Sequence, residues 1–137
     1  MAYIDHGFIE TKPDMPLSER LLFIMQSIRS VLDTYKPRES AVETLYFGRN
    51  VSSAIPVAEA RGVIFAVLAE YRLKVHDLRP NQIKKGITGV SGADKKQVQE
   101  MVRIILGLQE IPKPDHAADA LGAAICAANP AFIFNLQ

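Results

Sequence analysis

The chain has 137 residues, 48% hydrophobic and 23% charged, which predicts one globular domain over residues 1–137 with a sizeable core. No apolar run approaches the roughly 18 residues that a membrane span needs, and no signal-peptide pattern opens the chain, so we expect a cytoplasmic protein. The single cysteine, Cys126, excludes an internal disulfide and lies in an alanine-rich stretch typical of a core.

The net charge of +1 is unevenly distributed. Residues 72–103 contain eight lysines and arginines against three acidic residues, a local charge of +5, so the remainder carries −4. This asymmetry is compatible with a polyanion binding across one face. A solvated surface of mixed charge explains the same composition equally well.

The first half of the chain predicts alternating strands and helices. Residues 2–11 have the pattern of a strand, and a helix capped by Ser18 should run from about residue 17 until Lys36-Pro37 ends it. A strand that contains Glu43 follows. The next helix, residues 51–71, has one side of alanines and Gly62 and another of larger apolar residues, so we expect one side to pack on a partner subunit.

In the second half we expect a strand at Lys74–Leu78 and a short helix over residues 80–85. A further helix should begin after a capping-box-like pair, Ser91 and Asp94, and a last one should span Asp115–Ala128. Alternating strands and helices predict an α/β layered domain with neighbouring parallel strands. The tail after residue 129 is unassigned.

Glu43 stands out because a carboxylate on an otherwise apolar strand needs a cation, a donor or a metal. The aromatic residues Tyr46 and Phe47 follow it and could stack on bases, with Arg49 and Asn50 on phosphates. The ordinary alternatives are a salt bridge for the glutamate and a core position for the rings.

A second acidic group lies at the start of the last predicted helix. Asp119 shares a helix face with His116 and Asp115, and the alanines between them leave that face open. Oxygen-rich sites of this kind suit Mg²⁺ or Mn²⁺. Asp115 could equally be a helix cap, His116 a surface histidine and Asp119 the partner of a lysine.

Two lysine pairs flank the glycine-bearing loop at residues 86–92, and both could contact phosphate: Lys84, Lys85, Lys95 and Lys96. Surface lysines often have no specific role, so these pairs carry weight only together with the other residues.

Taken together, the motifs resemble the Holliday-junction resolvases of the RuvC type. The resemblance extends from Ile4 to Ala127 and is carried by Pro16-Leu-Ser-Glu-Arg-Leu21, Ala41-Val-Glu-Thr-Leu-Tyr-Phe47, Ala58-Glu-Ala-Arg-Gly-Val63, Gln82-Ile-Lys-Lys85, Gly89-Val-Ser-Gly-Ala-Asp-Lys95, Gln97-Val-Gln-Glu-Met-Val-Arg103 and His116-Ala-Ala-Asp-Ala-Leu121. It implies an RNase H-like, three-layer domain with a mixed sheet. It also implies a homodimer that nicks opposed strands of a four-way DNA junction symmetrically in recombination and repair.

The resemblance also implies roles for particular residues. Glu43 matches the strand glutamate of the family, Asp119 its final acidic ligand and His116 a variable ligand position, with Mg²⁺, or Mn²⁺, bound as two ions per site. Lys84 and Lys95 match lysines that approach the scissile phosphate. Tyr46 matches a base-stacking aromatic, helix 51–71 the dimer helix, and the implied partners are branch-migration proteins of the RuvA/RuvB type.

One feature departs from the family pattern. The family begins with a strand whose I-D-P-G aspartate binds metal, whereas this chain begins at what resembles the third strand. We therefore expect an N-terminally truncated domain that cleaves poorly. In one alternative, strand 2–11 moves into the vacant central place and brings Asp5 towards Glu43. The rival functions are a catalytically impaired junction-binding remnant and a purely structural dimer.

Overall fold

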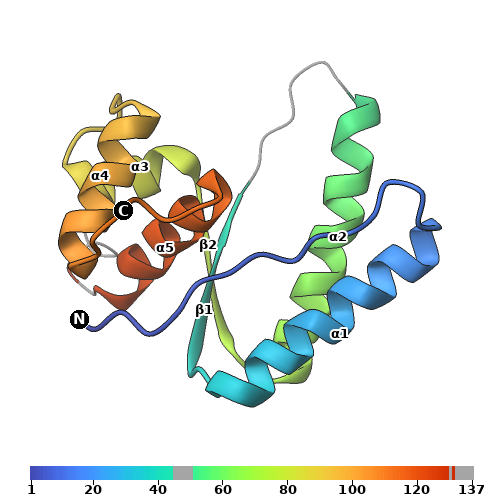
Figure 1. Cartoon of the computed structure of the whole chain (residues 1–137). Coiled ribbons are helices and arrows are strands. Elements are labelled where there is room, and N and C mark those ends of the chain that lie inside the picture. The colour runs from blue at the N-terminus through green and yellow to red at the C-terminus, as the bar shows by residue number, and fades with distance from the viewer. Residues whose placement is uncertain (45–50, 130, 132–137) are drawn as a thin grey trace. The chain divides into compact units, whose positions relative to one another are not determined.

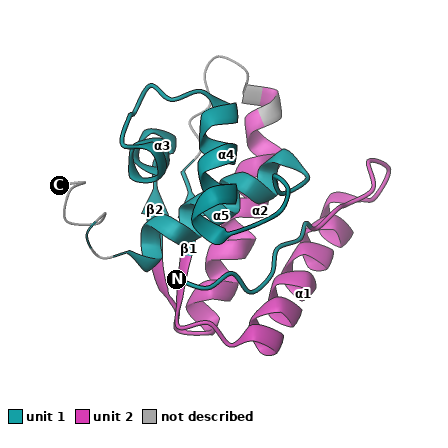
Figure 2. Cartoon of the chain, turned by 60° about the vertical axis from the view of Figure 1, so that its left-hand side comes forward, with its two compact units in different colours: residues 1–8, 41–45, 76–137 teal, residues 9–40, 46–75 magenta. Residues whose placement is uncertain are grey.

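The computed structural model describes residues 1–44, 51–129 and 131 (Figure 1). Its elements are α1 (Leu17–Tyr35), β1 (Glu39–Glu43), α2 (Val51–Glu70), β2 (Lys74–Leu78), α3 (Pro80–Thr88), α4 (Lys95–Leu106) and α5 (Asp115–Ala128). The chain forms two compact units, coloured separately in Figure 2. Unit 1 consists of residues 1–8, 41–45 and 76–137, and unit 2 of residues 9–40 and 46–75.

Strands β1 and β2 pair in a two-stranded sheet, and the helix that connects them makes the pair parallel. The last residues of both strands belong to unit 1, where the Thr44 amide donates a 2.7 Å hydrogen bond to the Leu78 carbonyl. Glu43 therefore lies at the carboxyl end of the sheet, the edge at which open α/β sheets place their ligands.

The prediction of a strand over residues 2–11 is wrong. This segment has no regular secondary structure, and the Ile4 and Phe8 side chains are 77% and 67% exposed. The physical reason is that alternation alone does not make a strand, because the backbone must also pair with a neighbouring strand. Among the described residues the sheet contains β1 and β2 alone, so the alternative in which this segment pairs beside β1 is also wrong.

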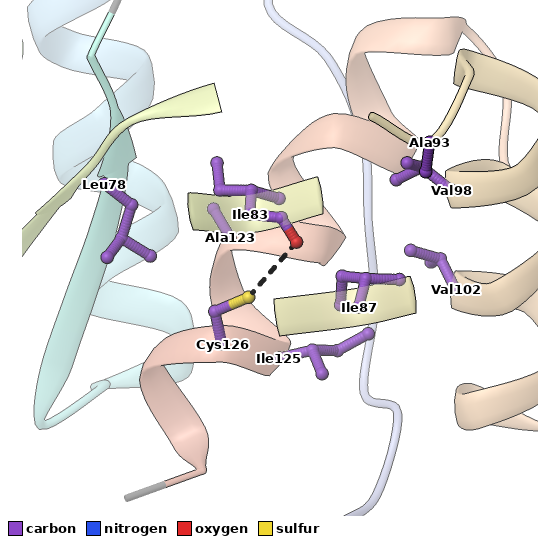
Figure 3. Packing of buried hydrophobic residues seen from close by; sticks show 9 residues of the cluster. All are labelled: Leu78, Ile83, Ile87, Ala93, Val98, Val102, Ala123, Ile125 and Cys126. Carbon is purple, nitrogen blue, oxygen red and sulfur yellow. Dashed lines mark hydrogen bonds between the residues drawn. The ribbon is translucent and has the colours of Figure 1, made fainter. Parts of the chain in front are cut away.

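The core of unit 1 is made by the three helices α3, α4 and α5, which pack on one another (Figure 3). Val102 is fully buried at its centre, and Leu78 joins the end of β2 to the same cluster. Gly122 allows close packing, because a Cβ atom there would lie 3.2 Å from Cγ2 of Ile83. The helices that carry the candidate residues are thus held in one rigid cluster.

Cys126 is a core residue, as the sequence predicts. It is 1% exposed, and its thiol donates to the Ile83 carbonyl at 3.8 Å. Burial raises the pKa of this thiol to about 11, so it stays protonated and unreactive at neutral pH.

Unit 2 contains α1 and α2, which pack together around Leu32, Val67 and Leu68. The Arg29 guanidinium binds both carboxylate oxygens of Glu70, at 3.0 and 3.1 Å. The Tyr71 hydroxyl donates to Asp33 at 2.7 Å. No helix in the described part of the chain is both long and apolar enough to cross a membrane.

Two predicted helix caps are wrong in detail. Ser18 lies inside α1, whose N-cap is Pro16, and α4 is capped by Asp94 rather than by a box that starts at Ser91. The Asp94 carboxylate accepts from the Gln97 amide at 2.9 Å, and the Gln97 side chain accepts from the Asp94 amide at 2.9 Å. The box is therefore real but starts three residues later, directly before the first helical residue. The predicted span of α5 is confirmed.

Replacing Asp94 by alanine should lower the free energy of unfolding by about 1 kcal/mol, because the Gln97 amide at the start of α4 loses its partner. Urea denaturation followed by circular dichroism measures this change. Asp94→Asn, which keeps an acceptor, should stay close to wild type, and Ser91→Ala should have no effect. A larger loss from Ser91→Ala than from Asp94→Ala would contradict this assignment of the cap.

Candidate active site

The candidate site is centred on Glu43, the last residue of β1, whose side chain is half-buried. Burial raises the pKa of its carboxyl, and the negative charge of Asp119 raises it further. The positive charges of His116, Lys84 and Lys95 act in the opposite direction. Five residues predicted from sequence are thus brought within electrostatic range of one another, all of them in unit 1.

These five residues come from four elements. Glu43 lies on β1, Lys84 on α3, Lys95 at the start of α4, and His116 and Asp119 in the first turns of α5. Because α3, α4 and α5 share one core, their packing determines where the charged side chains meet.

The spacing of His116 and Asp119 places them on one face of α5, as predicted. His116 Nδ1 lies 4.0 Å from Asp119 Oδ2. The imidazole side chain is 91% exposed, whereas the Asp119 side chain is 33% exposed. Asp119 is therefore the partly buried acid of the pair, and the histidine is free to reach towards solvent or a ligand.

Asp115 is the third acidic residue of this group, and its role is different. Its carboxylate Oδ2 lies 3.1 Å from Nζ of Lys95, and this hydrogen bond lowers the pKa of Asp115. Asp115 thus binds a lysine of the site. The alternative in which it is a helix cap is wrong, because the N-cap of α5 is Pro114 and no side chain caps this helix.

Two other predicted lysines do not converge on Glu43. Lys85 and Lys96 are exposed, and neither is among the charges that act on the Glu43 carboxyl. The predicted base-stacking and phosphate-binding residues lie outside the described residues: Tyr46, Phe47, Arg49 and Asn50.

Sequence reasoning missed two polar residues that support the site. The Thr44 hydroxyl, directly after Glu43, donates to the Asp77 carboxylate and joins the ends of β1 and β2. Gln99 is buried inside α4, only 8% exposed, and adds to the effect of Lys95 in lowering the pKa of Asp115. Gln99 could have been found from the sequence, since an amide among the apolar positions of a helix needs a partner.

The donor chemistry fits a hard divalent cation. In the described part of the chain no three histidine, cysteine or acidic side chains are gathered closely enough to hold a metal ion. Magnesium, however, often binds through one or two carboxylates and completes its shell with water and substrate phosphates. The mutual repulsion of Glu43 and Asp119 is what such a cation relieves.

An acidic pair at the carboxyl end of a parallel sheet, surrounded by lysines, defines an α/β protein with a site suited to phosphoryl chemistry. The family model of the crossover junction endodeoxyribonuclease RuvC matches residues 1–127. The chain therefore belongs to the RuvC family.

The relatives in this family are similar over most of their length. The crossover junction endodeoxyribonuclease RuvC of Treponema denticola is 50% identical over 126 residues, which is 92% of this chain and 71% of the relative. That of Chloroflexus aurantiacus is 47% identical over 126 residues, covering 92% of this chain and 77% of the relative.

Two solved structures are also similar. That of Thermus thermophilus RuvC is 35% identical with a TM-score of 0.81, and covers 93% of this chain and 75% of that one. The same protein in complex with a Holliday junction substrate is 36% identical with a TM-score of 0.85, over 91% and 76% of the two chains. The family resemblance and the RNase H-like α/β fold class are confirmed.

Replacing Glu43 by glutamine should stabilise the protein at pH 7. Folding raises the pKa of the Glu43 carboxyl above its unfolded value of 4.5. The protonated carboxyl therefore stabilises the folded protein at low pH, and this stabilisation is lost as the pH rises through the pKa of the folded state. Glutamine carries no charge at any pH, so the variant does not lose stability between pH 4 and pH 7 in this way. Thermal unfolding should show a higher midpoint than wild type at pH 7 and little difference at pH 4.

The matched control is Glu110→Gln, which removes an exposed carboxylate from the same unit. It should leave the midpoint unchanged at both pH values. If Glu43→Gln lowered the midpoint at pH 7, the inference that the folded protein disfavours this charge would be wrong.

Proposed function

We propose that this chain resolves four-way DNA junctions by hydrolysing phosphodiester bonds on opposed strands, in recombination and repair. The proposal rests mainly on one observation: the Glu43 carboxyl lies within electrostatic range of Asp119, His116, Lys84 and Lys95. The family supports it, because the relatives are crossover junction endodeoxyribonucleases and a related structure was solved with a Holliday junction substrate.

Glu43 and Asp119 are the proposed ligands of Mg²⁺, with Mn²⁺ as the alternative. When bound, the cation supplies a Lewis acid for the phosphate and lowers the pKa of a water molecule. The exposed imidazole of His116 is placed either to complete the ligand set or to carry the proton released by that water. The count of two ions per site stays a prediction.

The lysines have a separate proposed role. Lys84 and Lys95 neutralise the negative charge that develops on the scissile phosphate, and the exposed Lys85 and Lys96 bind neighbouring phosphates. The stacking role of Tyr46 and Phe47, and the phosphate contacts of Arg49 and Asn50, remain predictions for this chain.

Symmetric nicking needs two sites, and we propose a homodimer through α2. Large apolar side chains on α2 support it, since Ile55 and Val57 are 53% and 37% exposed and few charges interrupt the helix. A single domain over residues 1–137, partners of the RuvA/RuvB type and a cytoplasmic location remain predictions.

The catalytically impaired remnant is the less favoured function. The curated relatives carry the name of an endodeoxyribonuclease, and one of them is 50% identical over 92% of this chain. The charged residues around Glu43 are also more consistent with phosphodiester hydrolysis than with binding alone.

Glu43→Gln should abolish cutting of a synthetic four-way junction in Mg²⁺ while leaving junction affinity within about twofold of wild type, because it removes a cation ligand but no phosphate contact. Denaturing gels measure cutting and gel shifts in Ca²⁺ measure binding. Glu110→Gln, with the same change in charge, should cut normally. Continued symmetric nicking by Glu43→Gln would refute the proposed role.

The lysine pairs predict the salt dependence of binding. Each phosphate-bound lysine adds about 0.9 to the slope of log affinity against log salt, so Lys85→Ala with Lys96→Ala should reduce the slope by up to about 2. Titrating junction binding at several salt concentrations measures it. Lys12→Ala with Lys74→Ala, an equal loss of charge in unit 2, should reduce it much less. Equal reductions would show that charge alone, not these positions, governs binding.

A further inference from the structure

We propose that Asp115 is a positioning residue for Lys95, the lysine with which it forms an ion pair. The inference rests on the proposed function, in which Lys95 neutralises the scissile phosphate. It assigns Asp115 no contact with substrate or cation.

The first step is the direct contact. Lys95 is the first residue of α4 and Asp115 the first residue of α5, and the two helices pack on each other in the core of unit 1. Lys95 Nζ lies 3.1 Å from Asp115 Oδ2. The two ends of this ion pair are therefore carried by backbones that cannot move apart without disturbing the core.

The second step is the length of the two side chains. An exposed surface ion pair is usually weak, because two long side chains must be ordered. Here the aspartate is short and stands on the first residue of α5, so mainly the lysine chain has to be ordered. The buried Gln99, one turn after Lys95 on α4, adds to the effect of Lys95 in lowering the pKa of the Asp115 carboxyl.

The third step is why Lys95 needs a partner. Its side chain is 52% exposed, and the positive end of the α4 dipole disfavours an ammonium group at the first helical residue. The contact with Asp115 raises the pKa of Lys95 most, and the charges of Asp119 and Glu43 raise it further. Asp115 therefore stabilises the ammonium beside the acidic pair.

The test uses the full chain and single-turnover cutting of a four-way junction at saturating enzyme. Asp115→Asn should slow cutting at least about tenfold, because a misplaced group loses much of its effect, with junction affinity within about twofold of wild type. Asp115→Glu should restore most of the rate. Lys95→Ala combined with Asp115→Asn should cut no more slowly than Lys95→Ala alone, since Asp115 acts through the lysine.

Three outcomes of this experiment would overturn the proposal. They are an Asp115→Asn rate equal to wild type, a double variant in which the two losses multiply, and no rescue by Asp115→Glu in a variant with a wild-type thermal midpoint. Glu110→Gln is the control for loss of one surface carboxylate and should cut at the wild-type rate.

A second measurement separates this inference from the proposed function. In protein whose lysines carry ¹³C-methyl groups, the Lys95 signal, assigned by its loss in Lys95→Ala, should shift in Asp115→Asn and not in Glu110→Gln. A wild-type protein that fails to cut would refute the proposed function, and the Lys95 signal then decides the positioning contact alone. An unshifted Lys95 signal in Asp115→Asn would overturn it.

Discussion

The repulsion between the carboxylates of Glu43 and Asp119 is the constraint on which the site depends. Burial and this repulsion both raise the pKa of Glu43, so the folded chain holds a charge that it disfavours. Charges at His116, Lys84 and Lys95 offset only part of the effect. A site of this kind favours a bound cation, and Lys95, one of its lysines, is already paired with Asp115.

The core of unit 1 makes this arrangement possible. Two like charges stay near each other only if the elements that carry them cannot relax, and close-packed helices resist such movement. Gly122 lets α5 approach α3, and Val102 on α4 fills the centre of the cluster. The hydrogen bond of Thr44 with Asp77 and the ion pair of Lys95 with Asp115 then orient the ends of the strands and helices.

Much of the fold and site could be predicted from the sequence because local patterns determine them. The proline break at residues 112–114 predicted where α5 begins, and the three-residue spacing of His116 and Asp119 placed both on one face. The prediction of a strand over residues 2–11 was wrong because strand formation depends on a partner strand that is distant in sequence. The pairing of Asp115 with Lys95 was equally inaccessible, since no pattern within one helix predicts which charge of another helix it meets.

The division of the charged residues has a chemical consequence. If Lys95 paired with Glu43 or Asp119, the acidic pair would be neutralised and the lysine would be lost to a phosphate. Asp115 prevents both losses, because it holds the ammonium in an ion pair on the outer side of the same cluster. The ammonium group of Lys95 has three N–H donors, so it can stay paired with Asp115 and still donate to a phosphate. The packing of α4 against α5 thus allows one small site to present acids to a cation and an ammonium to a phosphate.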